Sequence, residues 1–367
     1  MGKQNSARYS MSHTLPQRSG SEPLMHQPTD DLRIRQIRPL IPPAILQEEI
    51  PITDEIAALV SNTRRQIGDI IHARDNRLVA IVGPCSIHDP VAAVDYAGQL
   101  KAIADDVQDK VLVVMRAYFE KPRTSVGWKG LINDPDLNES FHINKGLRLA
   151  RRVLVDVNAL GLPTGSEYLD TQIPQHISDV TSWVAIGART TESQVHRELA
   201  SGLSMPVGFK NNTEGNVQVA VDAVVAARNR HWFPGVTKQA IAAILETNGN
   251  EDCHIILRGG SRTGPNFEPE HVEKACERLR AQSLPCKVMV DCSHGNSRKD
   301  YRQQPAVLAS VAEQVPSGNI LGVMIESNIV EGRQDIGGEL VYGMSVTDGC
   351  VSIPQTRMML EQLAKAV

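Results

Sequence analysis

Short runs of β-branched and other apolar residues recur along the chain, and longer stretches with helical periodicity separate them. Strands buried on both faces of a parallel sheet read as continuous apolar runs of this length. Eight such runs are present, at Leu78–Gly83, Val111–Met115, Leu162–Gly165, Trp183–Gly187, Pro206–Phe209, His254–Leu257, Val288–Val290 and Ile320–Ile325. Periodicity alone does not distinguish a closed barrel from an open doubly wound sheet, but the count of eight favours an α/β fold of the (β/α)8 barrel type.

Every interval between these runs contains a segment that reads as a helix. Thr53 and Asp89-Pro90 mark two helix starts, because a threonine cap and a proline in the first turn both favour helix initiation. The clearest helical segments are residues 92–102, 145–160, 191–200, 216–228, 270–281, 305–314 and 355–366. The last of them is expected to close the barrel.

The chain divides by its pattern into three parts. Residues 1–28 are rich in Ser, Gln, His and Pro without periodicity, which predicts a disordered N-terminal segment. Residues 29–75 read as an extended arm followed by a helix, with an expected role in regulation or oligomerisation. Residues 76–367 contain all eight strand runs and are expected to form the catalytic barrel.

Composition and charge exclude several classes of protein. The chain is 41% hydrophobic but only 4% aromatic, and its net charge of −4 argues against bulk binding to nucleic acid or an anionic membrane. No apolar run approaches the roughly 18–20 residues of a membrane span. The N-terminus lacks the apolar stretch of a secretory signal, and the six cysteines have no disulfide-framework spacing. We therefore expect a cytoplasmic protein with reduced thiols.

Four residues with metal-binding side chains lie in segments that follow or close strand runs or come shortly before the last helix. They are Cys85, His294, Glu326 and Asp348. The active site of a barrel lies at the carboxyl ends of its strands, so these side chains are expected to converge there. A thiolate, an imidazole and two carboxylates suit Mn²⁺, Fe²⁺, Co²⁺ or Zn²⁺ better than Mg²⁺ or Ca²⁺, which prefer oxygen ligands.

Cationic side chains form a second set at the same strand ends. Guanidinium groups grip phosphate and carboxylate with paired hydrogen bonds, and lysine supplies a point charge. The set comprises Arg116, Lys121, Arg123, Arg189, Lys210 and Arg258, with the hydroxyl of Thr124 beside Arg123. Two separate basic clusters around one metal predict two anionic, phosphorylated substrates that are condensed together.

These motifs together resemble the type I, metal-dependent family of 3-deoxy-D-arabino-heptulosonate 7-phosphate (DAHP) synthases. The resemblance runs from Asp30 to the C-terminus. It rests on Gly-Pro-Cys-Ser-Ile-His-Asp at 83–89, Lys-Pro-Arg-Thr at 121–124, Gly-Ala-Arg-Thr-Thr-Glu-Ser at 187–193, Ile-Leu-Arg-Gly-Gly at 256–260 and Asp-Cys-Ser-His-Gly-Asn at 291–296.

The resemblance implies that the chain joins phosphoenolpyruvate to erythrose 4-phosphate, the first step of the shikimate pathway. It implies a divalent metal, Mn²⁺ before Fe²⁺, Co²⁺ or Zn²⁺, on Cys85, His294, Glu326 and Asp348. Arg116, Arg189, Lys210 and Arg258 would hold phosphoenolpyruvate, with Glu167 close by. Arg123 and Thr124 would hold the phosphate of erythrose 4-phosphate, and Lys121 would lie between the substrates. The metal, Glu167 and His294 are all candidates for activating the attacking water.

The same resemblance implies feedback inhibition by an aromatic amino acid. Asp30, Asp31 and Ile34 match the family's regulatory arm, which reaches a neighbouring subunit and so implies a homodimer or homotetramer. Near Phe233, phenylalanine-sensing members carry serine at the position of Gly235. Tyrosine-sensing members carry glycine there, as this chain does. Tyrosine is therefore the favoured inhibitor. Pro234 and the string Asn211-Asn212-Thr213-Glu214 depart from the usual family pattern.

Two alternatives stay open at the level of sequence. One is 3-deoxy-manno-octulosonate 8-phosphate synthase, which uses arabinose 5-phosphate on a similar barrel; the string at 121–124 and the N-terminal arm argue against it. The other is a non-catalytic paralogue that binds an amino acid and regulates a partner enzyme. The presence of every expected ligand argues against that.

Overall fold

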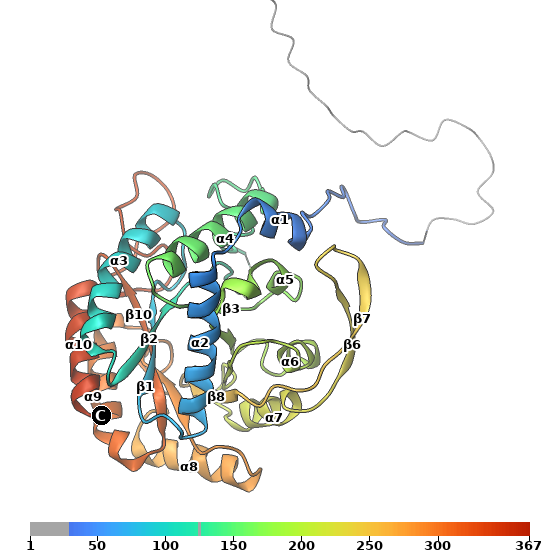
Figure 1. Cartoon of the computed structure of the whole chain (residues 1–367). Helices are drawn as coiled ribbons and strands as arrows, with labels where there is room; N and C mark the ends of the chain where they lie inside the picture. Colours follow the sequence, from blue (N-terminus) through green and yellow to red (C-terminus); the bar gives the residue numbers. More distant parts are fainter. Residues whose placement is uncertain (1–28, 124–125) are drawn as a thin grey trace, which may run out of the picture. The chain divides into compact units, whose positions relative to one another are not determined.

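The computed structural model describes residues 29–123 and 126–367, and its central element is a closed barrel of parallel strands (Figure 1). The barrel strands are β1 (Leu78–Gly83), β2 (Val111–Arg116), β3 (Thr164–Glu167), β4 (Trp183–Ile186), β5 (Val207–Lys210), β8 (Cys253–Leu257), β9 (Val288–Asp291) and β10 (Ile320–Asn328). Each pairs with the next in this order, and β10 pairs with β1 to close the sheet. The predicted (β/α)8 barrel and its eight strands are therefore confirmed.

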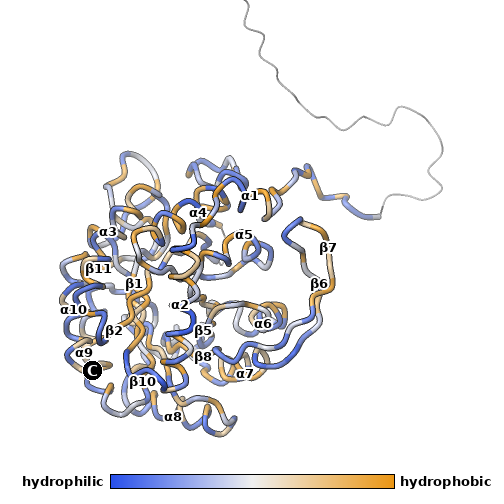
Figure 2. The backbone as a smooth tube through the Cα atoms, viewed as in Figure 1, coloured by the Kyte–Doolittle hydropathy of each residue, from blue (hydrophilic) through white to orange (hydrophobic). Residues whose placement is uncertain are grey.

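The barrel strands are buried on both faces, and alternate residues serve two different cores. In β1, Val79 and Ile81 point into the barrel interior, whereas Ala80 and Val82 pack outwards against the helices. The same parity holds in β2, where Val114 points inwards. Because both faces are buried, these runs are continuously apolar, and the segments labelled β1 and β2 are largely orange in Figure 2.

Helix α2 (Asp54–Ile71) packs against one end of the barrel. Its residues Ile67, Ile70 and Ile71 belong to the same buried cluster as the inward-facing strand residues. Thr53 caps the helix as predicted, since its hydroxyl accepts a hydrogen bond from the N–H of Ile56 at 3.3 Å. At its C-terminal end, His72 Nε2 lies 2.9 Å from Asp252 Oδ1, one residue before β8.

The remaining predicted helices are present with small shifts of their ends. They are α3 (Pro90–Val107), α4 (Ile143–Ala159), α6 (Gln194–Ser201), α7 (Gln218–Ala227), α8 (Pro269–Ala281), α9 (Gln304–Gln314) and α10 (Ile353–Lys365). Asp89 caps α3, accepting hydrogen bonds from the N–H groups of Val91 and Ala92. The helices surround the barrel and bury the outward-facing strand residues.

Several elements were not predicted. Helix α1 (Pro43–Glu49) begins where an extended arm was expected, α5 (Pro174–Ile177) is a single turn, and β11 (Val351–Ser352) adds to β10. The largest addition is a hairpin of β6 (Trp232–Val236) and β7 (Ala242–Glu246), inserted between α7 and β8 and seen beside α5 and α6 in Figure 1. Its proline and glycine concealed the strand pattern, because both residues are depleted in strands.

The compact unit that contains the barrel spans Leu40–Val367, so α1 and α2 belong to it, and residues 29–39 lie in a separate unit. Within that separate unit, the N–H of Ile34 bonds to the carbonyl of Asp31 in a turn. The expected disorder of residues 1–28 lies outside the described residues. Each of the six cysteines is described and carries a free thiol. Among the described helices, none combines the length and apolar character needed to cross a membrane.

Candidate active site

The polar residues of the candidate site lie on the same side of their strands as the apolar residues that face the barrel interior. Leu112 and Val114 of β2 face the interior, and Arg116 is the next residue on that face; Met324 of β10 is followed in the same way by Glu326. Asp291 of β9 and Lys210 of β5 end their strands on the same side. Since parallel strands present their carboxyl ends together, these side chains converge at one rim of the barrel.

Three of the four predicted metal ligands form a tight group at this rim. One ligand atom each of Cys85, Glu326 and Asp348 lies within 4.8 Å of the other two. Cys85 Sγ is 3.4 Å from Asp348 Oδ2 and 3.0 Å from the ammonium nitrogen of Lys121. A soft sulfur and two carboxylate oxygens are a donor set that fits a divalent transition metal.

The fourth predicted ligand, His294, lies at the edge of this group. Its Nε2 is 3.8 Å from Glu326 Oε1, and its Nδ1 is 2.9 Å from Asp291 Oδ2. Lys210 Nζ donates to the same carboxylate oxygen at 2.8 Å. The Asp291 carboxylate therefore lies within ion-pair distance of Nδ1, while Nε2 lies on the side of Glu326. A carboxylate beside the second ring nitrogen is usual for a histidine that ligates a metal.

Glu326 is held on both of its carboxylate oxygens. Arg116 donates to Oε1 at 3.0 Å, and the hydroxyl of Ser293 donates to Oε2 at 2.7 Å. The Arg116 guanidinium also donates to the carbonyls of Pro84 and Cys85 and stacks on the ring of Tyr118 at 3.5 Å. Arg116 was predicted to bind substrate. At least two of its three nitrogens instead donate to the strand ends that carry the metal group.

The electrostatics of the rim depend on burial and on the paired charges. Burial and the nearby Glu326 carboxylate raise the pKa of Cys85 to about 11. Burial would lower the pKa of Lys121, but the neighbouring Cys85, Glu326 and Asp348 outweigh it and raise that pKa. Burial likewise opposes ionisation of Asp291, yet His294 and Lys210 hold its pKa well below the usual range. The rim thus brings buried charged groups close to the exposed carboxylate of Asp348, and a divalent cation would fit there as a partner for the thiol and the carboxylates.

Arg258 follows β8 beside these groups and is oriented by its backbone. Its N–H donates to Asn211 Oδ1 at 2.8 Å, and its Nη1 reaches the carbonyl of Gly259 at 3.3 Å. Its Nε is buried and has no hydrogen-bond partner among the described residues. Burial lowers the pKa of Arg258; the Asp291 carboxylate acts against this and the charge of Arg189 acts with it. A buried donor without a partner fits an anion.

The other predicted substrate residues lie on the loop after β2 and at the end of β3. Lys121 is buried against Cys85, whereas Arg123 is exposed and donates from Nε to the carbonyl of Trp128. Thr124 lies outside the described residues. Glu167 ends β3 and is buried; a Cβ at Gly187 would lie 2.3 Å from its Oε1, so a side chain there would displace the carboxylate.

Sequence reasoning missed Glu120, which lies beside Lys121. Its buried carboxylate accepts from the N–H groups of Asp170 at 3.2 Å and Leu169 at 3.4 Å. Burial, with the charge of Asp170 second, raises its pKa to about 8. The only signal in the sequence was its position between two apolar residues and Lys121, which does not distinguish a buried carboxylic acid from a solvated one.

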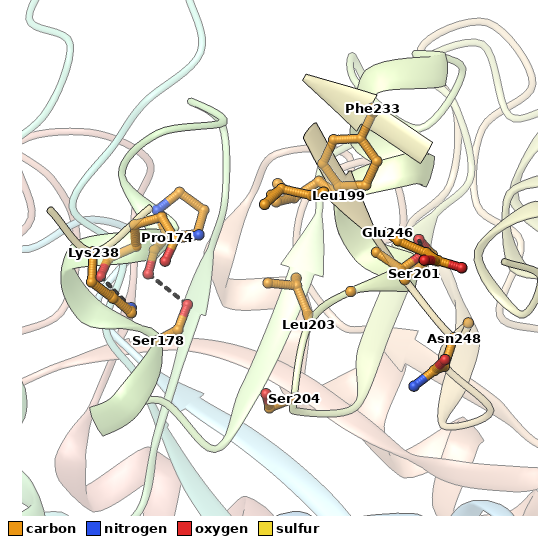
Figure 3. Close-up of a pocket in the computed structure, with 15 residues that line it drawn as sticks. Pro174, Ser178, Leu199, Ser201, Leu203, Ser204, Phe233, Lys238, Glu246 and Asn248 are labelled. Carbon is orange, nitrogen blue, oxygen red and sulfur yellow. Dashed lines mark hydrogen bonds between the residues drawn. The ribbon is translucent and has the colours of Figure 1, made fainter. Parts of the chain in front are cut away.

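A cavity of about 470 Å³ lies away from the rim, among α5, α6 and the hairpin (Figure 3). Phe233, predicted as an inhibitor-site residue, lines it together with its cross-strand partner Leu245 and with Leu199. Lys238 also lines it and donates to the carbonyl of Gln175 at 2.6 Å. Gly235 does not line the cavity directly, but a Cβ there would lie 2.6 Å from Leu245 Cδ1.

Comparison with known proteins agrees with this geometry. The model of the DAHP synthetase I family matches residues 49–361. The chain is 52% identical over 347 residues to the Phe-sensitive phospho-2-dehydro-3-deoxyheptonate aldolase of Escherichia coli K12, covering 94% of this chain and 99% of that one. It is 53% identical to the tyrosine-inhibited enzyme of Schizosaccharomyces pombe, covering 92% and 93% of the two chains.

A solved structure is similar over almost the same extent. The phospho-2-dehydro-3-deoxyheptonate aldolase of Francisella tularensis SCHU S4 superposes with a TM-score of 0.90 at 53% identity, covering 91% of this chain and 98% of that one. The residues matched by the family model include all eight barrel strands and the rim described above. The chain belongs to the DAHP synthetase I family.

Proposed function

We propose that this chain is a feedback-regulated DAHP synthase, which condenses phosphoenolpyruvate with erythrose 4-phosphate to DAHP and phosphate at the barrel rim. The observation that carries the proposal is the convergence of Cys85, Glu326 and Asp348 with buried cations at one end of the barrel. Membership of the family and relatives at 52–53% identity named for this aldolase support the same activity.

We assign the divalent metal to Cys85, Glu326, Asp348 and His294. Mn²⁺ is favoured, with Fe²⁺, Co²⁺ and Zn²⁺ as alternatives, because each accepts sulfur, nitrogen and oxygen ligands together. When bound, the metal supplies Lewis-acid polarisation of the aldehyde oxygen of erythrose 4-phosphate. The protein's own contribution is to orient the ligands: Asp291 pairs with the ring of His294, and Arg116 with Ser293 fixes Glu326 by hydrogen bonds.

The cations of the rim bind and orient the two anionic substrates. Arg258, Arg189 and Lys210 hold the phosphate and carboxylate of phosphoenolpyruvate, and the buried, unsatisfied Nε of Arg258 is a donor available for this. Arg123 and Thr124 hold the phosphate of erythrose 4-phosphate, and Lys121 lies between the substrates. Fixed positive charges offset the repulsion between the anions and bring the enol carbon to the aldehyde.

In this reaction C3 of phosphoenolpyruvate forms a bond to C1 of the aldehyde, water adds to C2, and phosphate leaves with cleavage of its C–O bond. The aldehyde oxygen takes up one proton and becomes a hydroxyl. Glu167 and His294 are the two side chains we assign to proton transfer around the attacking water. The pH profile of Glu167→Gln, whose metal ligands are all intact, distinguishes them. Loss of one limb of the profile identifies Glu167 as the acting group, and a profile with both limbs leaves His294.

We further propose that tyrosine is the inhibitor and that it binds the cavity lined by Phe233. Because Gly235 has no side chain, Leu245 keeps its place in the cavity wall. The cavity therefore has more room than it would have with a side chain at position 235. Asp30, Asp31 and Ile34 of the arm are assigned to the same regulatory site, contributed by a neighbouring subunit of a homodimer or homotetramer. Residues 29–75 would then serve regulation and assembly, residues 76–367 catalysis, and the enzyme would act in the cytoplasm.

Loss of the ultraviolet absorbance of phosphoenolpyruvate tests the proposal. Consumption that requires erythrose 4-phosphate, stops with chelator, returns with Mn²⁺ and is blocked by tyrosine is the expected result. Consumption with arabinose 5-phosphate instead would replace the activity by that of the octulosonate enzyme. Inhibition by phenylalanine or tryptophan alone would keep the activity and remove the assignment of tyrosine. No consumption under any condition would favour a non-catalytic paralogue.

A further inference from the structure

Strands β9 and β10 differ in length at the rim, and this leaves a gap in the sheet. β9 ends at Asp291, whereas β10 continues to Asn328. The last ladder bond between them runs from the N–H of Cys292 to the carbonyl of Met324, at 2.9 Å. In a parallel sheet, the backbone N–H and C=O of every second residue point towards the same neighbouring strand. After Met324, the next residue of β10 whose N–H and C=O point towards β9 is therefore Glu326.

Within residues 29–123 and 126–367, no strand reaches these two backbone groups, although Glu326 is only 2% exposed. The chain leaves β9 to form the loop that carries Ser293 and His294. A buried amide group without partners is strongly disfavoured, so the sequence must satisfy it in another way.

Gln304 supplies both missing bonds. It is the first residue of α9, is fully buried, and donates from Nε2 to the carbonyl of Glu326 at 2.9 Å. Its Oε1 accepts the N–H of Glu326, also at 2.9 Å. One side-chain amide thus takes the place of a strand residue beside Glu326.

We propose that Gln304 is a positioning residue for the metal centre, which substitutes for the absent strand and holds the backbone of Glu326 in register. The inference rests on the metal site of the proposed function. Arg116 and Ser293 already fix the two carboxylate oxygens, so Gln304 completes the restraint of this ligand from its backbone side. Outer partners of this kind typically change metal affinity by roughly 10- to 100-fold when they are removed.

The test compares two buried glutamines at opposite ends of the same helix. Gln304→Met keeps the shape of the side chain and removes both bonds to Glu326. Gln314→Met is the matched control. Gln314 is the last residue of α9, and its side-chain amide donates to the carbonyls of Phe267 and Ser310, which are far from Glu326 in the chain. Gln304→Glu keeps the acceptor and loses the donor, and it decides the question if Gln304→Met does not fold.

Two measurements on the full-length chain are needed. The first is titration of the metal-free protein with Co²⁺, followed through the thiolate-to-cobalt absorption that reports Cys85. The second is hydrogen exchange of the peptide that contains Glu326 in the Co²⁺-loaded protein. We expect Gln304→Met to weaken Co²⁺ binding roughly 10- to 100-fold and to speed exchange at Glu326. Gln314→Met should leave both unchanged, and Gln304→Glu should lie between.

The outcomes separate this inference from the proposed function. Wild-type binding without a thiolate-to-cobalt band would overturn the metal centre itself, and the inference with it. A normal band in the wild type with equal Co²⁺ affinity in Gln304→Met would overturn only the role of Gln304. Equal weakening by Gln304→Met and Gln314→Met would reduce that role to general stability of α9.

Discussion

The barrel rim and the cavity beside the hairpin are built on different principles. At the rim, the side chains of Cys85, Glu326 and Lys210 are 0%, 2% and 4% exposed, and each comes directly from a barrel strand or the turn after one. The hairpin beside the cavity exposes Trp232 by 58% and Ile244 by 76%. Among the strands that the structure describes, its two strands pair only with one another.

This difference assigns different tasks to the two regions. Buried charges that are bonded on several sides keep one geometry, as a reaction that must orient a metal and two anions requires. A hairpin attached through few buried contacts adjusts more easily, as expected of a regulatory site. Substitutions at the rim should therefore act on chemistry and metal binding, and those at the hairpin on inhibition alone.

The largest effect is expected from Cys85→Ala. Loss of the sulfur ligand should abolish metal-dependent turnover while the fold remains, because an alanine fits the buried space of the thiol. The loss should exceed the roughly 10- to 100-fold typical of an outer partner. Consumption of phosphoenolpyruvate, bound metal per chain and thermal unfolding measure the three quantities. Cys276→Ala, at a buried thiol in α8, is the control and should keep its metal. Full activity of Cys85→Ala would remove the metal assignment.

Arg258→Gln should weaken the binding of phosphoenolpyruvate. A hydrogen bond to a charged group contributes about 1.5–3 kcal/mol, so the KM for phosphoenolpyruvate should rise roughly 10- to 150-fold. The metal content should not change, since Arg258 bonds to backbone and not to the metal group. Steady-state kinetics with each substrate varied in turn measure the change. Arg280→Gln, an exposed arginine paired with Glu273, should behave as wild type. An unchanged KM would exclude Arg258 from the substrate site.

A smaller effect, confined to the hairpin, is expected from Gly235→Ser. The new Cβ would press on Leu245, and overpacking of this kind costs about 1–3 kcal/mol. Inhibition by tyrosine should weaken roughly tenfold, with little change in uninhibited turnover. Gly98→Ser is the matched control, because a Cβ at Gly98 meets nothing within 4 Å. A tyrosine response that is the same in both variants would contradict the assigned role of Gly235.

The last expected effect concerns stability at the loop after β2 rather than activity. The folded chain holds the pKa of Glu120 at about 8, against 4.5 for an ordinary glutamate. Between these two values the unfolded chain has lost this proton and the folded chain keeps it, so this group makes stability fall as the pH rises. Glu120→Gln should remove that part of the decline. Denaturant midpoints at pH 5, 6.5 and 8 measure it, and parallel curves for both proteins would show that Glu120 ionises normally.

Much of the barrel could be read from the sequence because parallel strands impose a simple pattern. Val79 and Ile81 belong to one continuous apolar run, and the chemically active residue follows within a few positions. The hairpin could not be read in this way. Trp232, Pro234 and Gly235 do not alternate as a half-buried strand does, and the tertiary structure overrides their local preferences.

The residues of the site also divide into those that could be predicted from the sequence and those that could not. Cys85 and Lys210 were predictable, since a polar side chain that closes or directly follows a buried strand run lies at the rim where a barrel carries its chemistry. Glu120 and Gln304 were not, because a buried carboxylic acid and a buried amide have no local signature. Their roles depend on groups 49, 50 and 22 positions away in the chain.

The sequence by itself therefore determined the eight strand runs, the helices between them and the types of residue at the strand ends, since these depend on periodicity and on neighbours along the chain. Only the tertiary structure decided which side chains meet. It directed Arg116 to Glu326, Lys210 to Asp291 and Gln304 to the unpaired backbone beside β9. The physical reason is that buried charges and amides must find partners in space, and closure of the barrel, rather than proximity in sequence, selects those partners.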